Sequence, residues 1–179
     1  MEITHLIIMF FVGVVAAAFG TLIGGSSIVT IPTLILLGLP PHTAIGTDRF
    51  GIIGVGISGW YKFHKKKLIN YKIGFIVAFP VLLGTFLGAN LVLQISESVL
   101  KYVIVATNII LVAFLLFNRG VGVEKRKTTI QKKEYVVGGA LSFINGIYGG
   151  FYGAMAGTFS MYILIGWFRQ TFIQSAATQ

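Results

Sequence analysis

The chain has 179 residues, of which 55% are hydrophobic and only 11% are charged, and its formal net charge is +9. A soluble domain carries about a quarter charged residues. This composition therefore excludes a soluble globular enzyme and a disordered chain, and it predicts an integral membrane protein that lies in the lipid bilayer. Because cysteine is absent, disulfide scaffolds, zinc ribbons and cysteine nucleophiles are excluded as well.

Most of the basic residues fall in two short stretches, 62–72 and 119–133, which separate apolar segments. Clusters of Lys and Arg in such places are typical of cytoplasmic loops. A nucleic-acid-binding protein would more often show interleaved aromatic residues or one basic helix face. We therefore expect a multi-pass protein of the cell membrane with both stretches in the cytoplasm, and no nucleic acid as a partner.

The N-terminal region, residues 6–39, is almost continuously apolar, but Gly24–Gly25–Ser26–Ser27 interrupts it. One straight helix of this length would measure about 50 Å, whereas the bilayer core is about 30 Å thick. We therefore expect a broken helix pair, with a short second member over 28–37. Irregular backbone at membrane depth is tolerated only where it packs in protein or lines a wet cavity. The break is thus either a tight bend or part of a substrate site.

Three further spans are expected, over 44–61, 73–93 and 99–117. The last two approach the roughly 20 apolar residues that cross a bilayer, and the short polar turn between them predicts a helical hairpin. Glycines spaced four apart, such as Gly84 and Gly88, predict close contact between helices.

The pattern of the N-terminal region returns after the second basic stretch. Residues 13–25 and 138–150 are both rich in small residues and both end in Gly-Gly. A short apolar stretch follows each of them, over 28–37 and over 154–165. The order of features, rather than residue identity, indicates an internal repeat.

This repeat divides the chain into a first repeat over 1–118, a basic cytoplasmic loop over 119–133 and an incomplete second repeat over 134–179. Five crossings before the second repeat would invert it and place Arg169 inside, whereas four would leave it parallel with Arg169 outside. We favour inversion, so the predicted fold is an all-α polytopic helical bundle with inverted repeats and helices broken at Gly-Gly, an architecture of transporters. The incomplete repeat predicts a fragment of a longer protein, or a chain completed by a homo-oligomer or a partner chain.

Residues 20–50 resemble the first-repeat signature of the TauE/SafE family of sulfite-exporter-like membrane transporters, and read GTLIGGSSIVTIPTLILLGLPPHTAIGTDRF. The likeness consists of the Gly-Gly, the early Pro32, the Gly-Leu-Pro-Pro-His segment and the Ala-x-Gly-Thr that ends at Thr47. Family members usually follow this threonine with a small polar and an apolar residue, whereas this chain has Asp48 and Arg49. The resemblance implies transport of sulfur-containing anions such as sulfite or organosulfonates.

Candidate substrate-binding residues come from both Gly-Gly regions. Ser26, Ser27 and Thr30 stand at the start of a short helix, where free N–H groups and hydroxyls can cap the helix or hold an anion. Asp48 and Arg49 are ionisable residues within a span, so they serve either the substrate or an interfacial or structural role. Protonation of Asp48 could couple transport to a proton gradient. The complete candidate set is Gly24, Gly25, Ser26, Ser27, Thr30, Thr47, Asp48, Arg49, Asn145, Gly149, Gly150 and Tyr152.

The leading functional hypothesis is a secondary transporter of small anions that works by alternating access between two repeats. The alternative is a non-transporting membrane subunit, or an inactive fragment that needs a partner for the missing helices. We expect no catalytic residues, because the chain lacks HExxH and GxSxG motifs. We expect no metal and no cofactor, because His5, His42 and His64 lie apart and no glycine-rich segment carries the lysine of a phosphate-binding loop.

Overall fold

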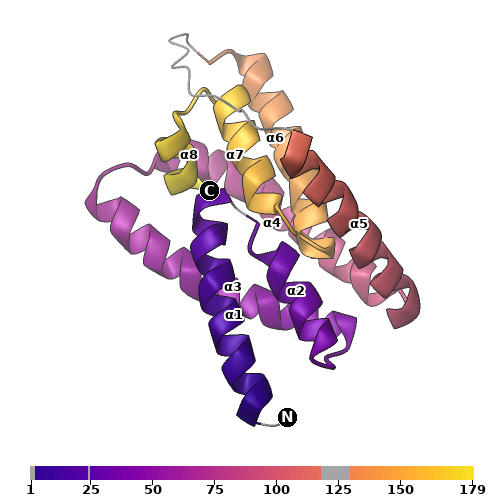
Figure 1. Cartoon of the computed structure of the whole chain (residues 1–179). Helices are drawn as coiled ribbons and strands as arrows, with labels where there is room; N and C mark the ends of the chain where they lie inside the picture. The colour runs from indigo at the N-terminus through magenta and orange to yellow at the C-terminus, as the bar shows by residue number, and fades with distance from the viewer. Residues whose placement is uncertain (1–2, 24, 118–129) are drawn as a thin grey trace.

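The computed structural model describes residues 3–23, 25–117 and 130–179, and all regular elements in these ranges are helices (Figure 1). The helices are α1 (Ile3–Ile23), α2 (Ser27–Leu36), α3 (Pro41–Lys65), α4 (Tyr71–Leu93), α5 (Glu97–Phe117), α6 (Lys132–Phe151), α7 (Ala156–Gly166) and α8 (Phe172–Thr178). The predicted spans 44–61, 73–93 and 99–117 lie within α3, α4 and α5.

A long helix followed by a break and a short helix occurs twice, as α1 with α2 and as α6 with α7. Helix α6 continues one residue past the expected end at Gly149–Gly150, to Phe151. The second break covers residues 152–155, where Gly153 and Met155 have φ angles of +74° and +62°. Gly153 follows the C-cap residue Tyr152 and its left-handed conformation ends α6, whereas Met155 directly precedes α7.

Helix α4 packs lengthwise against α6 through glycines on both helices. A Cβ atom on Gly84 or Gly88 of α4 would overlap backbone atoms of α6, and one on Gly146 or Gly150 of α6 would overlap backbone atoms of α4. The predicted close packing at Gly84 and Gly88 is therefore confirmed. It is backbone-to-backbone contact, which only residues without a side chain permit.

The predicted hairpin of α4 and α5 has its short turn at residues 94–96, but the long contact of α4 is with α6. The glycines of α4 face α6, so α6 can approach α4 more closely than an apolar helix with large side chains could.

Within the described residues, α4 is the one helix that is both long enough and apolar enough to cross a membrane by itself, with a mean hydropathy of 2.2. The apolar helices α2 and α7 are shorter, as is the apolar part of α1 over residues 9–18. Helix α3 has 25 residues, but Asp48, Arg49 and the lysines of its last turn make it more polar.

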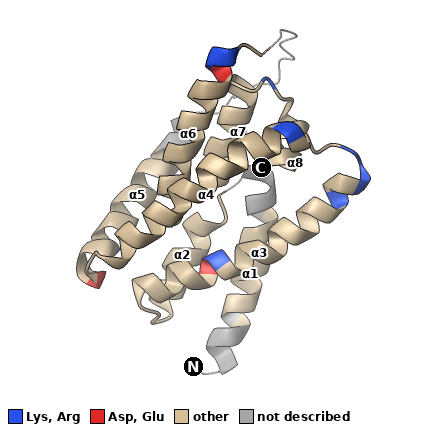
Figure 2. Cartoon of the chain, turned by 180° about the vertical axis from the view of Figure 1, so that it is seen from behind, with Lys and Arg blue, Asp and Glu red and all other residues tan. Residues whose placement is uncertain are grey.

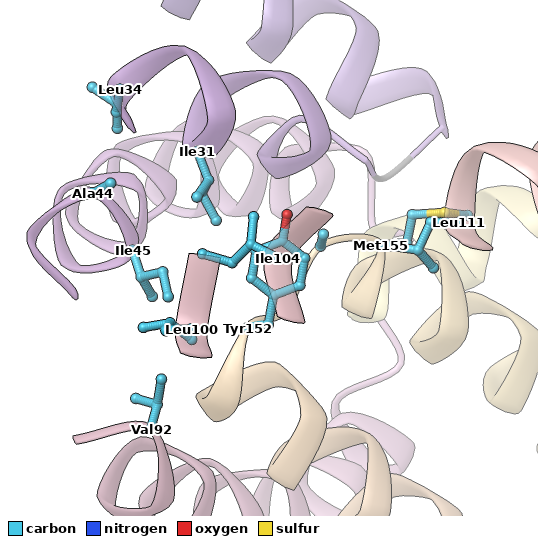
Figure 3. Close-up of a cluster of buried hydrophobic side chains, with 11 residues drawn as sticks. Ile31, Leu34, Ala44, Ile45, Val92, Leu100, Ile104, Leu111, Tyr152 and Met155 are labelled. Carbon is cyan, nitrogen blue, oxygen red and sulfur yellow. The ribbon is translucent and has the colours of Figure 1, made fainter. Parts of the chain in front are cut away.

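The larger cluster of buried apolar side chains joins the two breaks (Figure 3). Tyr152 and Met155 of the second break share this cluster with Ile31 of α2, Ile45 of α3 and Ile104 of α5. Both breaks are therefore packed in protein, as irregular backbone in a membrane requires.

Candidate functional site

The first break is held by Asp48, which lies on α3 with 8% of its surface exposed. Ser27 Oγ donates a hydrogen bond to Asp48 Oδ2 at 2.7 Å, and Thr30 Oγ1 donates one to Asp48 Oδ1. Both carboxylate oxygens thus face the start of α2. Of the two roles expected for these hydroxyls, capping of α2 is not observed, because the N-cap residue Ser26 makes no side-chain cap hydrogen bond and Ser27 donates to Asp48. The hydroxyls of Ser27 and Thr30 instead donate to the Asp48 carboxylate on α3.

The second break is reached by Arg49, the next residue on α3. Its Nη2 donates a hydrogen bond to the carbonyl oxygen of Tyr152. Gly153 provides the space for this contact, since a Cβ atom there would overlap the guanidinium. Among the described residues, the buried Arg49 Nε has no hydrogen-bond partner, and no carboxylate lies within ion-pair distance of the guanidinium.

Asn145 of α6 holds the start of α7. Its Nδ2 donates hydrogen bonds to the carbonyl oxygen of Ala156 at 3.1 Å and to Ser160 Oγ at 2.9 Å. The sequence singled out Asn145 but missed Ser160, because their contact depends on how the chain turns between α6 and α7.

Two tyrosines hold the rest of the second break. The hydroxyl of Tyr148 donates to the carbonyl oxygen of Ala154 at 2.7 Å, and that of Tyr152 donates to Asn108 Oδ1 on α5 at 2.8 Å. Asn108 thus makes the interhelical hydrogen bond that an asparagine inside a helical bundle favours. The break is held from α3, α5 and α6 at once.

A cavity of about 570 Å³ lies beside both breaks. Its wall includes Ser26 and Ser27 at the start of α2, Ala156 and Ser160 of α7, and Arg49 from α3. The first turns of two short helices therefore border one space, and the positive end of each helix dipole lies there. Together with the guanidinium, they make this part of the cavity favourable for an anion.

The same cavity extends to the end of the molecule at which α3 is followed by α4. Trp60 and Tyr71 line it there, and His64 lies between them, with its Nδ1 2.5 Å from the Tyr71 hydroxyl and its ring stacked on Trp60. In Figure 2 the Lys and Arg segments of the α3–α4 loop and of the start of α6 lie toward this end of the molecule. In the part of the chain that the structure describes, no group of three or more His, Asp or Glu side chains could hold a metal ion.

Not all of the predicted site residues lie at the cavity. Thr47 is exposed, and its hydroxyl donates to the Thr43 carbonyl of its own helix at 2.8 Å. Gly150 packs against α4, and Gly149 faces Ala156. Gly25 lies at the contact between the breaks, since a Cβ atom there would be 3.4 Å from Met155 Cγ. Gly24 lies outside the described residues.

Arg169 makes an ion pair with Glu134 in the first turn of α6, and its Nη2 donates to Glu134 Oε1. This hydrogen bond lowers the pKa of Glu134 below its ordinary value. Arg169 therefore lies at the end of α6 that directly follows the second basic stretch.

The family model described as "Sulfite exporter TauE/SafE" matches residues 9–179 of the chain. The chain belongs to the TauE/SafE family. A "Probable membrane transporter protein" of Haemophilus influenzae is 32% identical over 154 residues, which cover 86% of this chain and 59% of the relative. The "Probable membrane transporter protein YfcA" of Escherichia coli is 27% identical over 85% of this chain and 56% of the relative.

A third relative, the "Probable membrane transporter protein YdhB" of Bacillus subtilis, is 26% identical over 80% of this chain and 60% of its own length. The TauE/SafE chain thus spans less than two thirds of the curated relatives that it matches. No solved structure matches it. Family and relatives together identify a membrane-located protein of a transporter family.

Proposed function

We propose that this chain carries the binding site of a secondary transporter of small anions, with sulfite or an organosulfonate as the transported species. The observation that carries the proposal is the position of Arg49, whose guanidinium lines the cavity and has no carboxylate in contact among the described residues. A partly buried guanidinium that touches no carboxylate favours an anion beside it, because transfer of a charge out of water is costly unless that charge is paired.

The rest of the cavity fits the same class of ligand. Its volume of about 570 Å³ lies within the range of about 300–1,000 Å³ that small-molecule sites occupy. Ser26 and Ser160 are on its wall, together with the first turns of α2 and α7. Hydroxyl groups and helix N-termini donate hydrogen bonds to oxyanions. A sulfonate or sulfite group would meet several donors here.

Uptake of radiolabelled sulfite into proteoliposomes tests the proposal. The unaltered chain should accumulate sulfite. Arg49→Gln should abolish the uptake, because Arg49 is the only positively charged side chain that lines the cavity among the described residues. Lys101→Gln is the matched control, since it removes a positive charge from an exposed position on α5. Equal loss in both variants, or normal uptake by Arg49→Gln, would contradict the proposal. Correct folding with neither uptake nor binding would favour a non-transporting subunit.

We further propose that the two repeats are inverted and exchange access to the cavity between the two sides of the membrane. Each repeat supplies a broken helix whose short member begins at the cavity. The pairing of Arg169 with the first turn of α6 fits a cytoplasmic position for that end, as the distribution of lysine and arginine favours.

Cysteine labelling tests this orientation without background, because the chain has no cysteine of its own. Lys66→Cys in the α3–α4 loop should react with an impermeant maleimide only from the cytoplasm. Thr4→Cys near the start of α1 should react only from outside, whereas parallel repeats would place this position inside. Labelling of both from one side would remove the proposed topology.

Asp48 is the proposed site for a coupling proton. Protonation would weaken the hydrogen bonds that its two oxygens accept from Ser27 and Thr30, and so would loosen the start of α2. Sulfite uptake should then depend on pH in the unaltered chain and lose that dependence in Asp48→Asn. An unchanged pH profile in this variant would exclude Asp48 as the coupling site.

A further inference from the structure

We propose that Arg49 is a latch between the two helix breaks, and that an anion entering the cavity opens it by drawing the guanidinium away from the Tyr152 carbonyl. The inference rests on the proposed function, because it requires an anion in the cavity. It adds a way for anion binding in the cavity to change how the second break is attached to α3.

The link depends on the neighbouring positions of Asp48 and Arg49 on α3. Side chains of adjacent helix residues point about 100° apart. Asp48 accordingly holds Ser27 at the first break, while Arg49 holds Tyr152 at the second. A shift of the guanidinium therefore changes the attachment of the second break to the same helix turn that anchors the first.

The anion and the Tyr152 carbonyl would share one end of the guanidinium. Arg49 Nε is buried, so an anion in the cavity has to bind the terminal nitrogens, and Nη2 already donates to Tyr152. A carbonyl oxygen carries only a partial negative charge, whereas sulfite carries a full charge, so the guanidinium is attracted more strongly to sulfite. An oxyanion in the cavity therefore draws the guanidinium toward itself and away from the Tyr152 carbonyl.

Gly153 makes the release sterically simple. The guanidinium lies where a Cβ atom of residue 153 would be, so no side chain has to turn aside when it leaves. The neighbouring carbonyls of Ala154 and Ala156 stay bonded to Tyr148 and Asn145. Loosening should therefore be confined to the first residues of the break.

Hydrogen–deuterium exchange of the whole chain in detergent micelles tests the latch, with sulfite and sulfoacetate as probes and chloride at equal ionic strength as the control. Calorimetry on the same samples measures binding separately. In the unaltered chain, sulfite should speed exchange of peptides that contain residues 152 and 153 by about tenfold, the effect of losing one hydrogen bond from a charged donor. Peptides from the α4–α6 contact should not respond.

Arg49→Gln should show the faster exchange without any anion and no response to sulfite. Arg49→Lys keeps the charge with a different donor geometry, and it should bind sulfite more weakly while starting from the loosened state. Binding without faster exchange at residues 152 and 153 would overturn the latch and leave the proposed function intact. Equal exchange in unliganded Arg49→Gln and the unaltered chain would also overturn it. Failure of both probes to bind the unaltered chain would overturn both proposals.

Discussion

The two helix breaks have similar positions in their repeats but are held by opposite kinds of hydrogen bond. At the first break, hydroxyls on the short helix α2 donate to the carboxylate of Asp48. At the second, carbonyl oxygens of the break accept from Arg49 and Tyr148, and the carbonyl oxygen of Ala156, the first residue of α7, accepts from Asn145. The first break is thus tied by an anionic acceptor, and the second by donors, one of them cationic.

This difference explains where the positive charge of the cavity comes from. Asp48 accepts hydrogen bonds from Ser27 and Thr30 at the first break, whereas Arg49, among the described residues, donates to a neutral carbonyl at the second. The guanidinium therefore keeps its charge available to the cavity. The two Gly-Gly regions look alike in the sequence, but the contacts at the two breaks differ. Asp48 anchors the first break, whereas Arg49 brings a positive charge to the second.

Substitution of Gly153 should have the largest effect on stability. Gly153→Ala combines a left-handed backbone angle with overlap against the Arg49 guanidinium and the Gly149 carbonyl, so we expect a loss of about 4 kcal/mol of free energy of unfolding. Gly38→Ala is the matched control, because Gly38 has a φ of +94° and open space around it. It should lose about 1–2 kcal/mol. Unfolding in detergent measures both, and equal losses would show that the overlap at Gly153 costs nothing beyond its backbone angle.

Removal of the Asp48 carboxylate should be nearly as damaging. Asp48→Ala leaves the hydroxyls of Ser27 and Thr30 without their acceptor, and hydrogen bonds to a charged group contribute about 1.5–3 kcal/mol each. We expect a loss of about 3 kcal/mol of unfolding free energy. Thr47→Ala, one residue earlier and exposed, should change it by less than about 0.5 kcal/mol. A similar small change for Asp48→Ala would show that the first break is not anchored by this residue.

The two glycines at the end of α6 should respond differently. Gly150→Ala places a methyl group against the α4 backbone, so we expect a loss of about 2 kcal/mol. Gly149→Ala makes only an ordinary contact with Ala156, and the better helix propensity of alanine should make it neutral or stabilising. The comparison is read from thermal unfolding in detergent. Equal destabilisation would mean that both glycines are needed for the break.

The smallest effect is expected from the tyrosine that supports the second break. Tyr148→Phe removes one hydrogen bond to the Ala154 carbonyl and keeps the ring, so unfolding free energy should fall by about 1 kcal/mol. The same measurement on Tyr152→Phe, which loses the bond to Asn108, should give a similar value. A neutral Tyr148→Phe would indicate that the other contacts of the break suffice.

Much of the helical architecture was predictable, since apolar length and glycine spacing are local properties of the sequence. The bounds of α2 and α4 follow the expected 28–37 and 73–93 closely, and Gly84 and Gly88 are at a helix contact as expected. Asp48 and Arg49 stood out because a charge within an apolar segment needs a physical reason.

The partners of these residues could not be predicted in the same way. Whether Ser27 meets a substrate or Asp48 depends on how α2 packs on α3, which spacing along the chain does not determine. Ser160 and Tyr148 are ordinary residues of apolar helices until the second break turns α7 back toward α6. The left-handed angle at Met155 likewise has no local sequence signal, because a methionine does not favour it.

The central claim is that the Arg49 guanidinium makes the cavity between the breaks an anion site. Trp60 lines the same cavity, and Trp167 is the second of the two tryptophans, so a Trp167→Phe background leaves Trp60 as the fluorescent reporter. The most direct measurement is a sulfite titration of this protein with and without Arg49→Gln, against chloride at equal ionic strength. Saturable quenching that disappears in Arg49→Gln is the predicted result. Saturable quenching of equal affinity in both proteins would contradict the claim.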